Sequence, residues 1–491
     1  MSDAAPGETR TRTTLSSPDG PPSLSAAGRA LLLVFALAFP LATAWQRTES
    51  NQIKFFALAG FALLLGAALF CRFRAHCASW LADRRSRLAV VVWLVLSGYA
   101  VFFLGFSLPA LLFSAVFLVI VQAVACRKWL QNLVSGRILV LLALLTLDFV
   151  LCSFGTTDQY TALGGSYYRK TGLVTFGCCV LIFLGTAVFL SGAADCRRAV
   201  QWLLIGGFGV TLVGLLQFFG EKSFMPAFFP DLRMDPRSMG TFGHPNWFGT
   251  YLLLLFPLAV FEFFQERRLA WGALCCLLYA NLLTAQTRGA WLGAAAYLAF
   301  LGVARPERRR DTGRLLVLLF LVTAFLAPWH HWQILKRADT LSGDTELAVE
   351  GSSSAGTGRF GFWKYALKAL PAHAILGSGP DTLAQAGPPG VAAPVDKAHS
   401  IYLEYAVTVG LPGLLLYLAF LWHCTAPASS SLRHWTFRGV LVAYLVQGLF
   451  IHDTIQTWPL VWFVAGLAVS CSRAAPAASF ESQPAPFTAQ P

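Results

Sequence analysis

Apolar stretches of roughly 16 to 25 residues recur along most of this chain and constrain its fold more than any other feature. Stretches of that length suit α-helices that cross a lipid bilayer, whereas a membrane β-barrel would show short segments of alternating polarity. The composition agrees, because 56% of the 491 residues are hydrophobic and 12% are charged, against about 25% charged residues in a soluble domain. The sequence therefore predicts an all-α, polytopic membrane protein.

The division into spans gives about 12 to 14 transmembrane helices. Short loops rich in Lys and Arg mark the cytoplasmic side of a membrane protein, and most of the 37 Lys and Arg residues fall in alternate loops on the side of the N-terminus. We therefore predict a cytoplasmic (inner) membrane protein with both termini in the cytoplasm. The net charge of +13 reflects this topology and does not indicate nucleic-acid binding. The predicted spans lie near 30–45, 53–71, 88–105, 108–125, 138–154, 171–192, 199–219, 246–264, 269–286, 289–304, 313–328, 400–424, 436–452 and 456–471.

The same pattern predicts the domain organisation. We expect disordered cytoplasmic tails at 1–28 and 472–491, which are rich in Ser, Pro, Ala and similar residues. Between them lie a transmembrane bundle at 29–328, one large external loop module at 329–399 and the C-terminal transmembrane helices at 400–471. The cysteines show neither CxxC spacing nor Cys/His ligand spacing, so no disulfide framework, metal site or cofactor is expected.

Several arginines interrupt the apolar pattern on the external side, where Lys and Arg are normally rare. Arginine offers phosphate oxygens two parallel hydrogen bonds and keeps its charge. A cluster of arginines there predicts a site for a large anion, for which a lipid-linked pyrophosphate is the obvious candidate. The candidate residues for binding it are Arg169, Arg237, Arg288 and Arg359.

Each arginine also has a simpler interpretation to weigh. Arg169 follows Tyr167 and Tyr168 at the entry to a span, where an interfacial aromatic belt with a snorkelling cation is an equal alternative. Arg288 lies in a very short connection at the hydrocarbon edge, where an ionisable group indicates a functional site more often than a snorkelling side chain. Arg359 opens a segment that fits an amphipathic helix. The apolar side of that helix would consist of Phe360, Phe362 and Leu367.

Two histidines accompany the arginines. His244 lies in a turn that starts a span, which Asn246 is able to cap. A helix-entry turn explains the Gly, Pro and Asn residues of this segment, but it does not explain why Arg237 and His244 lie beside it. His399 precedes the long predicted span at 400–424, where a polar end-group is an equal alternative to a functional residue. The supporting residues are expected to be His244, Asn246, Lys397, Tyr402 and Glu404.

Four of these segments resemble, in order, the signatures of the O-antigen ligase and O-antigen polymerase family. They read RSMGTFGHPNWFGTYL, AQTRGAW, RFGFWKYALKA with LGSGPD, and KAHSIYLEYAVTVGLPGLLLYL, and they span about residues 235–424. The resemblance implies a C-type glycosyltransferase fold and transfer of a glycan from undecaprenyl pyrophosphate at the outer face of the cytoplasmic membrane. It implies that Arg288 and His399 are the functional arginine and histidine, with Arg237 and Arg169 carried over less closely.

The chemistry of this implied reaction suits the residues. The sugar–phosphate bond is already activated, so no nucleotide site is needed, and the sequence contains no Walker-type loop. Fixed donors for the charge on the leaving pyrophosphate are each worth on the order of 10²–10³ in rate, which would make a metal ion redundant. His399 would take the proton of the acceptor hydroxyl, a role worth roughly 10²–10⁴, or would instead orient the acceptor. The implied partners are the undecaprenyl-pyrophosphate-linked glycan, an acceptor glycolipid or glycan, and membrane lipids.

Other functions remain open from the sequence. Within the family, the protein could be a ligase for lipopolysaccharide or surface polysaccharide, a polymerase, or a protein O-oligosaccharyltransferase. A function of a different class is transport of a polyprenyl-linked glycan or another anion, because charged residues within spans also mark transport routes. Asp148, Glu262 and Asn281 lie within predicted spans, but the sequence shows no repeated half typical of transporters. We expect Asp148 to pair with an external arginine.

Overall fold

The computed structural model describes most of the predicted transmembrane region. The described residues are 22–42, 47–76, 130–220, 237–329, 334–336, 358–387, 395–426 and 432–473, with isolated positions at 114, 117 and 120. The predicted spans 88–105 and 108–125 lie outside the described residues except for those isolated positions. Most of both predicted tails and part of the external module also lie outside them.

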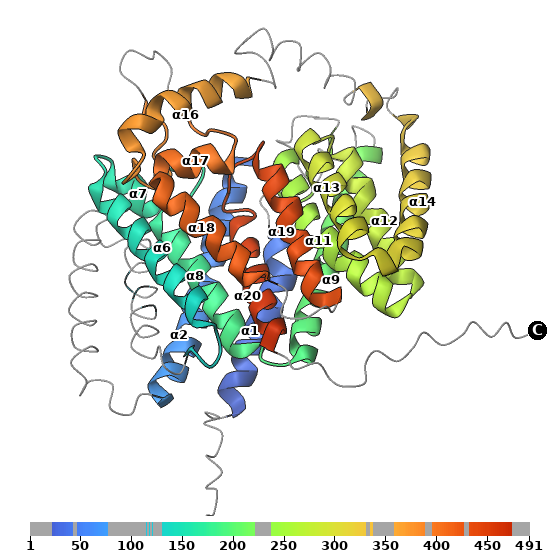
Figure 1. Ribbon diagram of the computed structural model, residues 1–491, viewed down its shortest axis with the longest axis horizontal. Coiled ribbons are helices and arrows are strands. Elements are labelled where there is room, and N and C mark those ends of the chain that lie inside the picture. Colours follow the sequence, from blue (N-terminus) through green and yellow to red (C-terminus); the bar gives the residue numbers. More distant parts are fainter. Residues whose placement is uncertain are drawn as a thin grey trace, which may run out of the picture.

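Regular secondary structure in these ranges is helical, which confirms the predicted all-α fold (Figure 1). A short 3-10 turn, Pro306–Arg308, precedes α14. The α-helices are α1 (Pro22–Leu41), α2 (Arg47–His76), α6 (Gly136–Gly155), α7 (Gln159–Gly164), α8 (Leu173–Phe189), α9 (Ala193–Phe219), α11 (Pro245–Glu266), α12 (Leu269–Thr284), α13 (Arg288–Ala304), α14 (Arg309–Leu326), α16 (Arg359–His373), α17 (Ile401–Thr408), α18 (Gly410–Cys424), α19 (Leu432–Gly448) and α20 (Trp458–Arg473).

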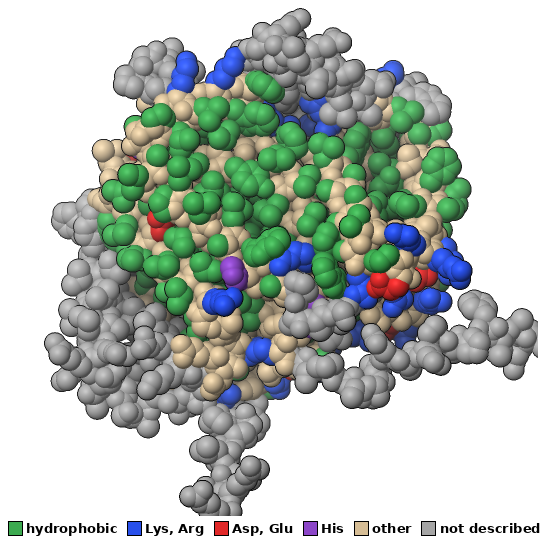
Figure 2. All heavy atoms as spheres, in the orientation of Figure 1, with side chains coloured by type: hydrophobic (Ala, Val, Ile, Leu, Met, Phe, Trp, Pro, Cys, Tyr) green, Lys and Arg blue, Asp and Glu red, His purple; other side chains and the backbone are tan. Residues whose placement is uncertain are grey.

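The apolar surface of these helices requires a bilayer. Among the described residues, four segments are long and apolar enough to cross one, namely Asn51–Phe73, Gly136–Gly155, Ala193–Phe219 and Pro245–Glu266, and shorter apolar helices accompany them. Phe320 and Phe325 of α14 are 69% and 65% exposed, which a soluble protein would avoid over a large patch. In Figure 2 hydrophobic side chains form a broad band over the visible face, with Lys and Arg gathered above and below it. The chain is therefore a multi-pass membrane protein.

The interior of the bundle consists of helices that are buried all round. Every residue of α8 is buried, and α20 packs along it. Trp462 of α20 lies edge to face with Phe176 of α8, with 5.5 Å between the ring centroids, and it meets Phe420 of α18 at 4.9 Å. Around this centre, α1 packs on α9, α11 on α12 and α19, and α13 on α19. This packing fixes which inter-helix connections meet at each end of the bundle.

The connections that contain the candidate site residues meet at one end, which we call the site end. It is the end at which α9 finishes and α11 and α13 begin, and α16 lies across it at the top of Figure 1. At the opposite end Arg197 of α9 pairs with Glu262 of α11 at 2.9 Å and also contacts Glu266. Glu262, one of the three polar residues predicted within spans, is thus neutralised far from the site end.

The long span predicted at 400–424 is wrong as a single helix, because the chain breaks it at Val409 into α17 and α18. Gly410 adopts φ +74°, which a side chain would strain, and a Cβ atom there would lie 2.4 Å from the carbonyl oxygen of Ile375. The N–H of Leu411 donates to the carbonyl of Ala374 at 2.8 Å. The connection that follows α16 therefore packs into the break and supplies a backbone partner there.

The predicted amphipathic helix is confirmed as α16, but the prediction that Leu367 lies on its apolar, packed side is wrong. Tyr365, Ala366 and Ala369 are buried, whereas Leu367 is 53% exposed. The small side chains of Ala366 and Ala369 allow α16 to approach α17 closely, and α16 packs against that helix. Local side-chain hydrophobicity did not reveal that contact.

Asp148 of α6 does not form the expected pair with an arginine. Its hydrogen-bond partner among the described residues is the thiol of Cys152, with 3.9 Å between Sγ and Oδ2. The same oxygen would lie 2.3 Å from a Cβ atom at Gly413 of α18. The absence of a side chain at Gly413 lets α18 cover the carboxylate, which keeps Asp148 within the helix interface.

Candidate functional site

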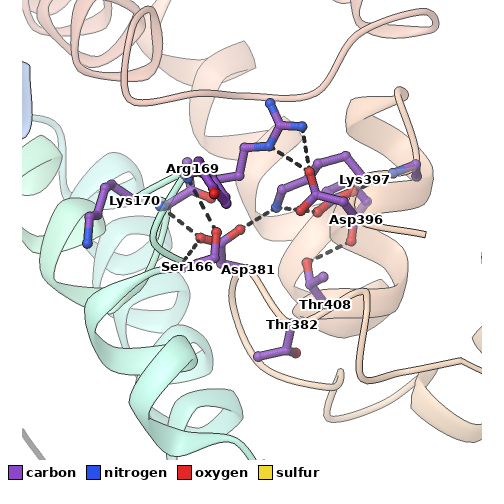
Figure 3. Close-up of polar contacts among 12 residues, drawn as sticks. Ser166, Arg169, Lys170, Asp381, Thr382, Asp396, Lys397 and Thr408 are labelled. Carbon is purple, nitrogen blue, oxygen red and sulfur yellow. Dashed lines mark hydrogen bonds and ion pairs between the residues drawn. The ribbon is translucent and has the colours of Figure 1, made fainter. Parts of the chain in front are cut away.

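A buried ion-pair network joins three segments at the site end (Figure 3). The Nζ atom of Lys397 lies 2.6 Å from Oδ1 of Asp381 and 2.8 Å from Oε1 of Glu404. Oδ2 of Asp381 accepts hydrogen bonds from the backbone N–H groups of Ser166 at 2.7 Å and Thr171 at 3.2 Å. The network therefore holds the connection between α7 and α8 against the segment that precedes α17.

Charge pairing favours the ionised forms of Asp381 and Lys397 despite their burial. Burial alone would raise the pKa of Asp381, but the Lys397 ammonium and the two backbone donors lower it below its usual value. Burial would likewise lower the pKa of Lys397, but the carboxylates of Asp381 and Glu404 raise it. Lys397 is 3% exposed, so its charge stabilises the site from within.

Arg169 lies in the connection held by this network and faces a carboxylate. Its Nε atom donates to Oδ2 of Asp396 at 2.7 Å (Figure 3). The guanidinium lies over the ring of Trp247, 5.9 Å from its centroid. The side chains of Arg169 and Asp396 are 23% and 56% exposed. The carboxylate thus occupies the part of the guanidinium that matches phosphate oxygens, at a position open to solvent.

His399 lies just before α17 in a left-handed backbone conformation, with φ +51°. Its ring stacks on Phe362 of α16 at 5.3 Å, and its Nδ1 atom is buried without a hydrogen-bond partner in the part of the chain described. Burial and the nearby charges of Arg359 and Arg169 lower the pKa of His399 to about 4. The imidazole is therefore neutral near pH 7 and can accept a proton.

A second histidine, His452, accompanies His399 and was not singled out from the sequence. Their ring centroids lie 4.9 Å apart, and His452 is 2% exposed. Burial, together with His399 and Arg169, keeps the pKa of His452 well below its usual value. An ionisable pair, His452 followed by Asp453, at the end of the apolar stretch 436–452 was the signal that could have revealed it.

His244 forms the N-cap of α11, which corrects the prediction that Asn246 does so. Nδ1 of His244 accepts a hydrogen bond from the N–H of Asn246 at 3.1 Å. Pro245 occupies the first turn, where its fixed φ and missing N–H are favourable, so the helix begins one residue earlier than predicted. Asn246 lies inside α11, and its carbonyl accepts from Nε2 of Gln447 at 3.5 Å.

Arg237 lies beside the short junction between α12 and α13. The next residue, Ser238, donates its N–H to the carbonyl of Thr284 at 3.0 Å, and its Oγ atom donates to the carbonyl of Gly214 at 2.7 Å. These bonds attach the segment that precedes α11 to the ends of α9 and α12. Arg237 is therefore brought close to the connection that contains Arg288.

Arg288 is the first residue of α13 and is 8% exposed. The very short connection expected between the two spans is confirmed, because α12 ends at Thr284. A Cβ atom at Gly289 would lie 3.2 Å from Cβ of Phe450, so the first turn of α13 packs against the connection between α19 and α20. That connection includes His452, so Arg288 borders the segment that holds the second histidine.

The remaining predicted residues hold helices together. The hydroxyl of Tyr402 donates to the carbonyl of Leu445 at 2.8 Å and so joins α17 to α19. Oε2 of Glu404 accepts from the N–H of Ala398 at 2.8 Å and fixes the turn around His399. Arg169, Arg359 and Lys397 lie close enough to His399 for their charges to act on it, whereas Arg237 and Arg288 lie at the junction of α12 and α13.

This fold defines a class, the helical multi-pass membrane proteins, and in this chain arginines and histidines gather at one end of the bundle. Comparison with family models matches residues 272–418 to the O-antigen ligase family. This match confirms the predicted resemblance to that family over the matched residues, and members of the family are glycosyltransferase-type enzymes. The matched region contains Arg288, Arg359 and His399. The comparison with curated proteins gives no match.

Proposed function

We propose that this protein transfers a glycan from a polyprenyl pyrophosphate, by resemblance undecaprenyl pyrophosphate, to an acceptor hydroxyl at the outer face of the cytoplasmic membrane. The observation that supports this most is a neutral histidine next to arginines. His399 is half-buried, and Arg169 and Arg359 lie close enough for their charges to lower its pKa. A proton acceptor beside groups that bind an anion is the pair of functions that this reaction needs.

The arginines would bind the donor through its pyrophosphate. Arg169 already holds one carboxylate, that of Asp396, with two guanidinium nitrogens. Phosphate oxygens match the same fork and carry more charge, so the donor would displace Asp396. Arg237, Arg288 and Arg359 would contact the remaining oxygens and stabilise the charge that develops as the pyrophosphate leaves.

His399 would act on the acceptor. As the hydroxyl oxygen attacks the anomeric carbon, the bond between that carbon and the phosphate oxygen breaks and its electron pair stays on the pyrophosphate. The hydroxyl proton passes to His399. A base with a pKa of about 4 is weak, but the negative donor offsets Arg169 and Arg359, so donor binding would raise that pKa toward the working range.

We propose that the reaction is independent of metal ions, because arginines supply the positive charge for the leaving group. Transfer measured with purified protein should proceed at the same rate with and without an excess of EDTA. Loss of activity in EDTA that added Mg²⁺ or Mn²⁺ restores would contradict this part of the proposal.

Within the family, we propose a ligase that uses an acceptor glycolipid in lipopolysaccharide or surface polysaccharide assembly, with polymerase and protein glycosylation as the variants. Transport of the same lipid is the alternative of a different class. Broken helices in transporters line the substrate or ion path. Here Ala374 and Ile375 fill the break between α17 and α18, which favours transfer over transport.

The test uses purified protein in nanodiscs with a lipid-linked donor and a glycolipid acceptor. Arg288→Ala and His399→Ala should each lower glycan transfer by at least about 100-fold. The matched control is Arg268→Ala, because Arg268 is 74% exposed at the opposite end of the bundle. Donor that crosses the membrane of sealed vesicles without being consumed would instead establish transport.

A further inference from the structure

Four buried nitrogen atoms in the rings around His399 have no hydrogen-bond partner within the described chain. They are Nε1 of Trp363, Nδ1 of His399, and both Nδ1 and Nε2 of His452. A buried polar atom without a partner is destabilising, and native structures contain few of them. A group of them in one place indicates a surface that is completed by a ligand.

The rings that contain these nitrogens belong to one cluster. His399 lies between Phe362 and His452, at 5.3 Å and 4.9 Å, and Trp363 lies 6.3 Å from Phe450. The first turn of α16 supplies Phe362 and Trp363, and the connection between α19 and α20 supplies Phe450 and His452. We call these five residues the ring cluster.

The ring cluster suits a ligand with both polar and apolar faces. An alkyl chain would pack on the rings but would leave the four nitrogens without partners. A phosphate would require fixed cations, and within the ring cluster the side chains are neutral at pH 7. A sugar presents hydroxyl groups that donate and accept, together with C–H faces that pack on aromatic rings, as in many small-molecule sites.

We propose that the ring cluster, formed by Phe362, Trp363, His399, Phe450 and His452, is the subsite that binds the sugar ring of the acceptor. The identification of the bound sugar as the acceptor rests on the proposed function, whereas the binding of a sugar by these residues does not. The imidazole nitrogens of His452 and the indole N–H of Trp363 contact the sugar hydroxyls next to the one that reacts. His399 then meets the reacting hydroxyl on one side, while Arg169 and Arg359 lie near it for the donor.

The binding test uses the full chain in nanodiscs and saturation-transfer NMR. The probes are methyl glycosides of common hexoses and heptoses. At least one probe should bind, and His452→Phe, which keeps a ring and removes both nitrogens, should weaken its binding roughly tenfold. The matched control is His423→Phe in α18, whose ring bonds to the carbonyl of Ala419, and it should leave binding unchanged. Absence of probe binding, or equal binding by both variants, overturns the subsite.

Two further variants separate hydrogen bonding from packing. His452→Gln keeps one donor and one acceptor and should retain most of the binding lost in His452→Phe. Trp363→Phe removes the indole N–H but keeps a ring, and it should weaken binding severalfold, whereas Trp329→Phe, just after α14, should not. Thermal unfolding of each variant reports whether it folds. If every variant that loses binding, the Gln variant included, has also lost its folded structure, the result counts against the subsite.

Kinetics then distinguish the subsite from the proposed function. If transfer occurs, His452→Phe should raise the acceptor KM roughly tenfold and leave the donor KM unchanged. Transfer with an unchanged acceptor KM refutes the subsite and leaves the proposed function standing. Binding of a glycoside that depends on His452, in a protein that transfers nothing, supports the subsite and refutes the proposed function.

Discussion

Under the proposed function, Asp396 would decide how readily Arg169 binds the anionic donor. The two side chains form an ion pair that is partly open to solvent, with the carboxylate 56% exposed. Exposed pairs are worth about 1 kcal/mol or less, so a pyrophosphate with two phosphate groups can replace the carboxylate. The pair keeps Arg169 in place without holding it so tightly that substrate cannot compete.

The first prediction concerns removal of the Asp396 carboxylate. Asp396→Asn should strengthen the binding of inorganic pyrophosphate by a fewfold, because the carboxylate no longer occupies the guanidinium of Arg169. Calorimetry with protein in nanodiscs measures this. Asp311→Asn, which alters an ion pair with Arg267 elsewhere, is the control. Weaker pyrophosphate binding in Asp396→Asn would contradict the prediction and would mean that Asp396 mainly positions Arg169 and does not compete with the anion.

The second prediction concerns pH and His399. Protonation removes the base, so the rate should fall as pH decreases through its pKa. Because the pKa of His399 is lowered to about 4 without substrate, kcat/KM for the donor should stay flat down to about pH 5. The donor charge raises the pKa in the complex, so kcat should begin to fall at a higher pH than kcat/KM does. Identical acid limbs in the two profiles would contradict this coupling.

At the scale of elements, the ion-pair network and the broken helix position the site. Asp381 and Lys397 join the connection before α8 to the one before α17. Gly377 lies beside the break, where a Cβ atom would be 2.3 Å from the carbonyl oxygen of Thr408. Close backbone approach at this point therefore depends on glycine, and so does the course of the chain from α16 to Asp381.

The third prediction tests the network. Lys397→Met leaves two buried carboxylates without their cation and should destabilise the protein by about 3–5 kcal/mol. Thermal unfolding in nanodiscs should show a lower Tm at pH 7. Lys364→Met on the exposed face of α16 is the matched control and should leave the Tm nearly unchanged. Equal Tm values for both variants would show that the network contributes little.

The fourth prediction tests the break between α17 and α18. Gly410→Ala places a Cβ atom at φ +74° and 2.4 Å from a backbone oxygen. It should lower stability by about 1–3 kcal/mol or more and reduce glycan transfer by displacing the turn before α17. Gly302→Ala in α13, where a Cβ meets no atom within 4 Å, should be neutral or slightly stabilising. Wild-type activity and stability in Gly410→Ala would refute the role of the break.

At the scale of the whole molecule, hydropathy predicted most of the helices but few of the contacts between segments that are distant in the sequence. Apolar stretches revealed the helices, because each must hide its own backbone from lipid. The break at Val409 was missed because residues 400–424 are largely apolar, and the contact that supports the break comes from a distant segment. His452 was missed because its place beside His399 depends on tertiary packing. The arginines were found because charges in an apolar chain are conspicuous, whereas the pairing of Lys397 with Asp381 depends on tertiary packing.

The fifth prediction concerns orientation. A cysteine introduced at the exposed Ala372 of α16 should react with an impermeant thiol reagent in intact spheroplasts, relative to the unsubstituted chain. Gly302→Cys, toward the other end of α13, should react only after lysis. Mass spectrometry of the labelled peptides gives the answer. The reverse pattern would place the site end in the cytoplasm and remove the basis for an external acceptor.

Asp381 accepts hydrogen bonds from the connection that contains Arg169 and pairs with Lys397, two residues before His399. The proposed anion-binding residue and the proposed proton acceptor are thereby held by one ion-pair network. A glycan transferred at this site would therefore have to place the bond between its first sugar and the pyrophosphate at a fixed position relative to this network. Differences between the sugars of different substrates would then have to be accommodated by side chains outside the network, while the network itself stays unchanged.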